Sequence, residues 1–349
     1  MSRRPLLVMV GGFLGAGKTS LILAAAEKLQ RRGMRVAAIL NDQGEDLVDT
    51  QLAAQHGVSA DQVTGGCFCC KFGDLVAAAE RLEIHQPDVI FAEAVGSCTD
   101  IVATTLRPLL RDYGDRFRLA PFTVLVDTLM AEALLADEDM AFLWRNQVDE
   151  ADLVWCTKDD LWSGYSGDLP HLSVRSGAGV DEWLEQVLGE GALVDASVGA
   201  KALNLDYGRY ARAEAALAWL NCRVTVRPQV ACSPAMVVGP LLDSLDAALT
   251  HAGARIVHLK VMAQCETGYV KAAQCGNGQQ PEVEGVLDAS PAPEHDVLVN
   301  LRAVGEPEVL RAIVQASFAA LEAAHDAALE WRLFQCFRPA PPVPWLSAR

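Results

Sequence analysis

Short apolar runs of strand length recur through the first half of the chain, separated by segments with the composition of helices. The runs cover residues 5–10, 35–40, 88–92, 122–127 and 153–156, and residues 173–175 fit a short last strand. Residues 18–32 and 180–188 indicate helices, the first of which stops at Gly33. Continuous apolar strands separated by helices predict a parallel sheet covered on both faces. We therefore expect an α/β domain over residues 1–190.

The pattern changes in the second half. A small, polar stretch predicts a linker at 191–215. Beyond it we expect strands at 220–227, 255–263, 268–274, 296–302 and 329–337, helices at 235–251 and 308–325, and a loop at 276–293. This order of strands and helices is typical of a ferredoxin-like α+β domain, which we assign to residues 216–338. The proline-rich residues 339–349 are expected to form an extended tail.

Charge and hydropathy exclude two classes of partner. The 349 residues include 29 Lys and Arg against 45 Asp and Glu, a net charge of -16. Nonspecific binding to nucleic acid or to an anionic membrane needs a basic surface, so neither partner is expected. No apolar stretch approaches the roughly 20 residues that cross a bilayer.

The sequence GFLGAGKT at 12–19 has the form GxxxxGK[ST] of a phosphate-binding loop. Its glycines allow backbone amides to turn inward, and the following helix presents its N-terminus to phosphate oxygens. Lys18 would neutralise phosphate charge, and the hydroxyl of Thr19 would bind Mg²⁺. The alternative is a glycine-rich turn without a ligand. The candidate phosphate-binding residues are Gly12, Gly15, Ala16, Gly17, Lys18, Thr19 and Ser20.

A candidate base-binding sequence, TKDD at 157–160, follows a strand near the end of the α/β domain. GTPases place an [NT]KxD loop there, in which the last Asp accepts hydrogen bonds from guanine and the Lys packs over the base. A Ser-Val pair then stands where such proteins support guanine O6 through a backbone amide. Charged turns of this kind are frequent, but after a phosphate loop the order favours GTP. The candidate residues are Thr157, Lys158, Asp160, Ser173 and Val174.

Three thiols occupy four positions at Cys67, Cys69 and Cys70. Thiolates favour Zn²⁺, Co²⁺ or Cu⁺ over Mg²⁺. On an extended segment Cys67 and Cys69 share one face, and Cys70 faces away unless the chain bends. Three thiols leave a fourth position for a carboxylate or water. The alternatives are buried small side chains or a redox pair. A nucleotide loop beside adjacent thiols indicates a reducing cytoplasm, where thiols stay free.

Together these motifs resemble the CobW-like metallochaperone GTPases, relatives of UreG and HypB. The resemblance rests on GGFLGAGKTS, NDQGE at 41–45, GGCFCC at 65–70, EAVG at 93–96 and TKDD, in that order. It implies a SIMIBI-class P-loop GTPase fold and slow GTP hydrolysis. It also implies delivery of Zn²⁺ or Co²⁺ to a client, with the CxCC motif as the metal site.

The resemblance also assigns roles to acidic residues. Glu93 matches the family's ExxG motif, and would sit near Mg²⁺ and the γ-phosphate with Lys18. Asp42 and Glu45 stand where relatives carry NEFGE, so Asp42 is a catalytic candidate and Glu45 a candidate metal ligand. The alternative for Glu93 is an ordinary carboxylate at a strand end. Cys98, just after the ExxG motif, is a further candidate ligand, and the seven histidines form no cluster.

These observations lead to a functional hypothesis. GTP with Mg²⁺ orders residues 41–50 and Glu93, which draws Cys67 and Cys69 into a tetrahedral metal site, and hydrolysis releases the metal to a client. The expected partners are GTP, a divalent metal ion and an unknown client metalloprotein, with a homodimer as one candidate assembly. The alternatives are a metal-buffering or sensing module, a GTPase gating corrinoid loading into an enzyme, and a P-loop kinase, which TKDD disfavours.

Overall fold

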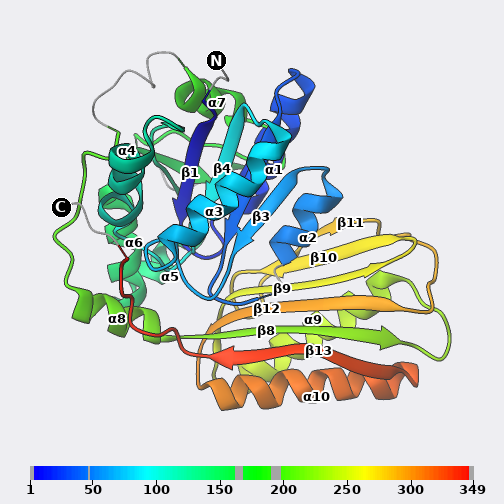
Figure 1. Ribbon diagram of the computed structural model, residues 1–349. Helices are drawn as coiled ribbons and strands as arrows, with labels where there is room; N and C mark the ends of the chain where they lie inside the picture. The colour runs from blue at the N-terminus through cyan, green and yellow to red at the C-terminus, as the bar shows by residue number, and fades with distance from the viewer. Residues whose placement is uncertain (1–3, 46–47, 162–167, 190–197, 346–349) are drawn as a thin grey trace. The chain divides into compact units, whose positions relative to one another are not determined.

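The computed structural model describes residues 4–45, 48–161, 168–189 and 198–345, which fall into two compact units (Figure 1). The first unit comprises residues 1–43, 49–214 and 341–349. The second comprises Gly44–Val48 and Ala215–Ala340. A five-residue segment from the first half of the chain therefore belongs to the second unit.

A parallel sheet forms the centre of the first unit. Its strands lie in the order β3-β2-β4-β1-β6-β7, with the short β5 also paired to β1. Four of the strands are buried along their whole length, which explains the continuous apolar runs in the sequence. The strands are β1 (Leu6–Gly12), β2 (Val36–Asn41), β3 (Ser59–Val63), β4 (Val89–Glu93), β5 (Arg118–Leu119), β6 (Thr123–Asp127) and β7 (Leu153–Thr157).

Helices cover both faces of this sheet, as predicted. Figure 1 shows α3 in front of the strands and α1 behind them. The helical segments are α1 (Lys18–Arg31), α2 (Val48–Gln55), α3 (Phe72–Leu82), η1 (Glu83–His85), η2 (Val102–Leu106), α4 (Arg107–Tyr113), α5 (Ala131–Leu135), α6 (Glu138–Glu150), η3 (Asp159–Leu161), α7 (Val180–Leu188) and α8 (Tyr207–Ala215). None of the helices among the described residues is long and apolar enough to cross a membrane.

Two segments of the first unit differ from the sequence prediction. The predicted strand at 173–175 is wrong, because these residues form a turn in which Gly177 N–H donates to Ser173 O at 2.9 Å. Helix α8 occupies the last part of the predicted linker at 191–215, since Tyr210, Ala213 and Glu214 are buried on one of its faces. Residues 190–197 of that linker lie outside the described residues.

The second unit is an antiparallel sheet with two helices, so the predicted α+β domain is confirmed. Its strand order is β11-β10-β9-β12-β8-β13. The order β9-β12-β8-β13 is that of a ferredoxin-like fold, and the β10–β11 hairpin extends it beside β9. The elements are β8 (Leu217–Arg227), α9 (Pro234–His251), β9 (Arg255–Cys265), β10 (Gly268–Gln274), β11 (Glu282–Gly285), β12 (His295–Val304), α10 (Pro307–His325) and β13 (Ala328–Phe337). β11 lies within the predicted loop at 276–293.

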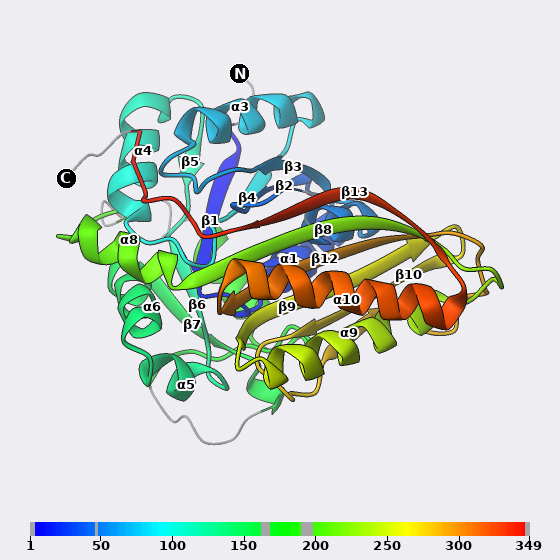
Figure 2. The same cartoon turned by 90° about the horizontal axis from the view of Figure 1, so that it is seen from below.

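Both helices of the second unit pack on one face of its sheet (Figure 2). Alternate residues of β8 and β12 turn toward them and form a continuous apolar core. The intervening residues turn to the other face, where Met262 and Leu298 pack with Val48. Val48 N–H also donates to Asn300 Oδ1 at 3.0 Å. The segment that follows β2 is therefore anchored on the helix-free face of this sheet.

Candidate functional site

The loop after β1 has the backbone of a phosphate cradle. Gly12, Gly15 and Gly17 have φ values of 131°, 80° and 86°, which favour glycine. A Cβ on Gly12 would lie 2.5 Å from the carbonyl oxygen of Leu125, whereas one on Gly17 would meet nothing within 4 Å. Helix α1 begins directly after Gly17, so the loop leads into a helix N-terminus, which suits an anion. Lys18 Nζ donates to Gly12 O at 2.9 Å across this loop.

Glu93, at the end of β4, meets the two polar residues that begin α1. Thr19 Oγ1 donates to Glu93 Oε2 at 2.8 Å, and Lys18 Nζ lies 4.0 Å from Glu93 Oε1. Just beyond Glu93, a Cβ on Gly96 would lie 2.9 Å from the backbone nitrogen of Leu14, so only glycine allows this close approach. The structure thus brings Glu93 to Lys18 and Thr19, although Glu93 lies 74 residues after Thr19 in the sequence.

The TKDD segment at the end of β7 is bonded to the same loop. Thr157 Oγ1 donates to Ala16 O at 3.0 Å, which joins the segment to the phosphate loop. Lys158 has a φ of 62° and its ammonium lies 2.9 Å from Asp127 Oδ2, at the end of β6. Sequence reasoning missed Asp127, although an acid ending a buried strand was a usable signal.

The last two candidate base-binding residues lie in the turn at 173–177. Ser173 Oγ donates to Asp160 Oδ1 at 2.6 Å, which fixes the orientation of that carboxylate. Val174 is half-buried in the same turn. The structure therefore gathers the predicted nucleotide residues at the carboxyl edge of one parallel sheet, where open α/β sheets bind ligands.

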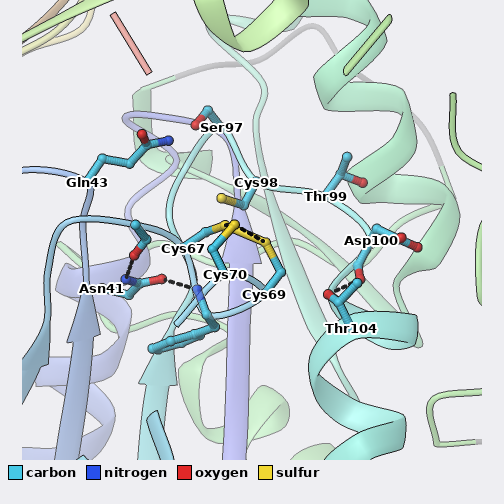
Figure 3. The surroundings of a disulfide bond; sticks show 12 residues. Asn41, Gln43, Cys67, Cys69, Cys70, Ser97, Cys98, Thr99, Asp100 and Thr104 are labelled. Atoms are coloured by element: carbon cyan, nitrogen blue, oxygen red, sulfur yellow. Dashed lines mark hydrogen bonds between the residues drawn. A yellow bond between two sulfur atoms is a disulfide. The ribbon is translucent and has the colours of Figure 1, made fainter. Parts of the chain in front are cut away.

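The three thiols of the CxCC motif converge in a tight turn (Figure 3). Cys70 N–H donates to Cys67 O at 3.0 Å and Lys71 N–H to the same oxygen at 2.9 Å. This turn is the bend that the sequence analysis left open as the alternative to an extended segment. It brings all three sulfur atoms within 4.8 Å of one another, so Cys70 does not face away. Three thiols so close together suit a soft divalent cation.

Cys67 and Cys69 are joined by a disulfide, with Cys70 Sγ 3.5 Å from Cys67 Sγ and 3.6 Å from Cys69 Sγ. The other eight cysteines, all of them in the described ranges, form no disulfide. The expectation that all thiols stay free is therefore wrong for this pair. Sulfur atoms that converge on one point are also within reach of each other for oxidation. Since the thiolate is the metal ligand, the motif must be reduced before it can bind metal through all three residues.

Asn41, the last residue of β2, holds the thiol loop in place. Its Nδ2 donates to Val63 O at 2.9 Å and to Gly66 O at 2.8 Å, and its Oδ1 accepts from Phe68 N–H at 2.9 Å. Figure 3 shows this clamp beside the sulfur atoms. No role for Asn41 was predicted from sequence, although an Asn that ends a buried strand and begins the NDQGE segment was a signal.

The two acidic candidates of the NDQGE segment belong to different units. Asp42 follows Asn41 directly, is half-buried, and its N–H donates to Val63 O at 3.1 Å. Glu45 belongs to the second unit, where its side chain is exposed. Among the described residues, the cluster suited to a metal consists of the three cysteines alone. The metal role of Glu45 therefore stays a prediction.

Glu214, in α8, is a buried carboxylate that sequence reasoning missed. Ser97 Oγ donates to its Oε1 at 2.6 Å, and Gln43 Nε2 donates to the same oxygen at 3.0 Å. Cys98 Sγ lies 3.9 Å from this oxygen. Burial raises the pKa of Glu214 to about 7, and burial likewise raises the pKa of Cys98 well above its ordinary value.

The proline-rich tail, predicted as extended, lies along the thiol motif. Trp345 N–H donates to Cys69 O at 2.9 Å. Burial raises the pKa of Cys70, while a hydrogen bond from the backbone of Val343 acts in the opposite direction. The tail therefore contacts two of the three cysteines through its backbone.

Comparison with known sequences gives matches in the first half of the chain. The sequence model described as "CobW/HypB/UreG, nucleotide-binding domain" matches residues 6–175. The chain is 29% identical over 162 residues to the zinc chaperone YjiA of Escherichia coli K12, covering 44% of this chain and 49% of YjiA. It is 34% identical over 122 residues to the urease accessory protein UreG of Ureaplasma parvum, covering 32% of this chain and 57% of UreG. The matches span about half the length of these relatives.

Similar solved structures include Zn(II)-bound YjiA GTPase from E. coli, with 14% identity, 91% of this chain and 99% of that chain covered, and a TM-score of 0.33. HypB from Helicobacter pylori in complex with nickel has 15% identity, 58% and 90% coverage, and a TM-score of 0.38. Scores this low add nothing to the description of the site.

Proposed function

We propose, on the premise that residues 6–175 are a nucleotide-binding domain of the CobW/HypB/UreG family, that this protein is a GTPase that binds Zn²⁺ and passes it to a client metalloprotein. One observation carries the proposal. Asn41 and Glu93 end the neighbouring parallel strands β2 and β4, and Asn41 clamps the thiol loop while Glu93 contacts the phosphate-binding loop. A change in the bound nucleotide could therefore reach the thiol loop through two adjacent strands.

In this proposal the first unit binds GTP with Mg²⁺. The amides of residues 12–17 and the N-terminus of α1 hold the phosphates, and Lys18 neutralises their charge. Thr19 provides a hydroxyl ligand for Mg²⁺, and Glu93 and Asp42 act beside the γ-phosphate. Asp160, oriented by Ser173, accepts from guanine. Mg²⁺, when bound, stabilises the charge that develops as the γ-phosphate leaves.

The three thiolates bind the metal cargo. We place Zn²⁺ first, because two relatives are named zinc chaperone YjiA and zinc-regulated GTPase metalloprotein activator 1. Co²⁺ has similar ligand preferences and serves as a spectroscopic probe. A reducing cytoplasm is the compartment we propose, since the Cys67–Cys69 disulfide must be reduced before both residues can act as thiolate ligands.

The proposal predicts that nucleotide state changes metal affinity. We would measure Zn²⁺ and Co²⁺ affinity by competition with a chromophoric chelator, in reductant and Mg²⁺, with GDP and then with a non-hydrolysable GTP analogue. We expect binding at least about tenfold tighter in the GTP state, a coupling of ~1.4 kcal/mol or more. Equal affinities in the two states would contradict the switch and favour a buffering module.

Two variants separate the nucleotide site from the thiol site. Cys69→Ser should lose tight metal binding and keep GTP binding, while Lys18→Ala should lose GTP affinity and keep metal binding without nucleotide. Cys156→Ser is the matched control, because Cys156 is a buried free cysteine of β7 outside the thiol motif. Unchanged metal affinity in Cys69→Ser would exclude the motif as the metal site.

A further inference from the structure

Helix α8 contacts the segment that follows β4, residues 94–106, through three polar side chains. Tyr207 Oη donates to Asp100 Oδ2 at 2.6 Å, Tyr210 Oη accepts from Thr99 N–H at 3.2 Å, and Glu214 Oε1 accepts from Ser97 Oγ at 2.6 Å. The three α8 residues stand at positions i, i+3 and i+7, so they share one face of the helix. Figure 3 shows their partners Ser97, Thr99 and Asp100 along the segment. One face of α8 therefore bonds to the first half of this segment at three places.

The segment at 94–106 begins against the phosphate-binding loop. A Cβ on Gly96 would lie 2.9 Å from the backbone nitrogen of Leu14, so the two backbones are in direct contact. Glu93, directly before the segment, accepts from Thr19 Oγ1 at the start of α1. A nucleotide that shifts the loop or Glu93 therefore also shifts the start of this segment.

The backbone of the segment combines two sparsely populated conformations. Asp100 has a φ of 69°, in the left-handed region that few residues other than glycine adopt. The turn that follows, η2 (Val102–Leu106), is π-helical, and single π-helical turns occur mostly at functional sites. Thr104 Oγ1 donates to Asp100 O at 2.5 Å, and Tyr207 bonds to the carboxylate of the same residue. Contacts of this kind maintain an uncommon backbone conformation, so a change in them allows the segment to adopt another.

Helix α8 also lies where the chain enters the second unit. At Glu214 the chain leaves the first unit, and β8 begins three residues later. Glu214 Oε1 accepts from Gln43 Nε2 at 3.0 Å as well, and Gln43 is the last residue of the first unit before Gly44–Val48. One carboxylate oxygen thus joins two places where the chain passes into the second unit, and Ser97 donates to the same oxygen.

We propose that α8 transmits the nucleotide state of the first unit to the second, with Tyr207, Tyr210 and Glu214 as positioning residues that couple the segment at 94–106 to the start of β8. The inference rests on the GTPase part of the proposed function and is independent of the metal. Exchange of GTP for GDP changes the contacts of Glu93 and the phosphate-binding loop, the segment adopts another conformation, and the three contacts carry this change to α8. Because such coupling is reciprocal, a client that binds the second unit and stabilises one position of α8 also changes the affinity for GTP.

Hydrogen exchange of the full chain tests this coupling, read by mass spectrometry in Mg²⁺ with GDP and then with a non-hydrolysable GTP analogue. In the wild type, the exchange rates of amides in residues 207–222 should differ between the two nucleotides at least about fivefold, the lower end of usual allosteric couplings. Tyr207→Phe/Tyr210→Phe removes two hydroxyls and keeps both rings, so most of this difference should disappear. Ser97→Ala removes the third contact from the side of the segment and should also reduce the difference. A variant that only loosens α8 would raise the exchange rate with both nucleotides alike.

Tyr113→Phe is the matched control and should keep the full difference, because Tyr113 is a half-buried tyrosine of α4 whose ring centre lies 6.0 Å from that of Phe72. Binding of GDP reports that each variant is folded, and the two single tyrosine variants replace the double variant if it fails to bind. Equal exchange at 207–222 with both nucleotides in the wild type would overturn the inference, as would a double variant that keeps the wild-type difference. Either result leaves the metal test of the proposed function in force, whereas a chain that binds neither nucleotide overturns both.

Discussion

Glu150, the last residue of α6, is a fully buried carboxylate. Its Oε1 accepts from Thr99 Oγ1 and its Oε2 from Val102 N–H, both at 3.0 Å. Burial raises its pKa to about 8, and the charge of Asp100 acts in the same direction. The folded protein therefore holds this proton at pH values where the unfolded chain has released it.

The free energy of unfolding should therefore fall as pH rises from about 4.5 to about 8, because the unfolded state binds fewer protons in that window. Glu150 alone would contribute up to about 1.4 kcal/mol per pH unit. Glu150→Gln removes the ionisable group, so it should flatten this slope and become the more stable protein near pH 8. Urea unfolding at four pH values from 5 to 8 measures the slope, and parallel slopes for the two proteins would contradict the prediction.

Residues in motifs could be predicted from sequence, and residues that hold the motifs could not. The spacing around Lys18 and Thr19 is typical of a phosphate-binding loop, and the spacing of the three cysteines is typical of a metal site. Asn41 and Glu214 belong to no recognisable motif, because their hydrogen-bond partners lie in other elements. Asn41 bonds to residues 63–68, and Glu214 bonds to Gln43 and Ser97. Such roles depend on tertiary contacts and appear only once the strands are placed side by side.

At the scale of elements, Gly44, Glu45 and Val48 show how residues that follow β2 are held by the sheet of the second unit, to which they belong. Asn221 Nδ2 donates to Glu45 O at 3.0 Å, and Glu45 N–H donates to Gln335 Oε1 at 3.1 Å. A Cβ on Gly44 would lie 1.7 Å from Asn221 Nδ2. Asn221 cannot easily turn away, because its Oδ1 accepts from Arg302 at 2.7 Å and its side chain is buried.

Gly44→Ala should therefore release this segment from the sheet. We expect the amides of Glu45 and Val48 to exchange hydrogen about fivefold faster, consistent with the loss of a net hydrogen bond of ~1 kcal/mol. Hydrogen exchange read by mass spectrometry measures this directly. Gly73→Ala is the matched control, since a Cβ there would meet nothing within 4 Å. Unchanged protection of the two amides in Gly44→Ala would show that the segment is held by other contacts.

Elements with a strong apolar pattern were predicted almost to the residue, and weakly patterned ones were missed. Helix α7 and strand β10 match the prediction in full. Strand β3, with the sequence SADQV, was missed because only Val63 is buried in it. The turn at 173–177 was mistaken for a strand, since three residues are too few for periodicity to distinguish a turn from an edge strand.

At the scale of the whole molecule, the chain passes between its two units at residues 43–44, 48–49, 214–215 and 340–341. The sequence predicted a single linker, because composition shows where the pattern of one domain gives way to that of the next. It does not show that a short segment such as Gly44–Val48 belongs to the other unit. After residue 340 the chain belongs to the first unit again, and there Trp345 N–H donates to Cys69 O. The tail thereby covers part of the thiol motif.

Removal of that one backbone donor should open the motif to reagents. Trp345→Pro removes the N–H, and the loss of a net hydrogen bond of about 1 kcal/mol predicts that Cys70 of the reduced protein reacts roughly fivefold faster with a thiol reagent. Trp345→Ala keeps the N–H, and its lost side chain is 73% exposed, so its rate should stay near that of the wild type. Labelling of the Cys70 peptide, followed by mass spectrometry, distinguishes it from the other partly exposed cysteines. Equal rates for the two variants would mean that the side chain of Trp345, rather than its backbone, governs access to the thiols.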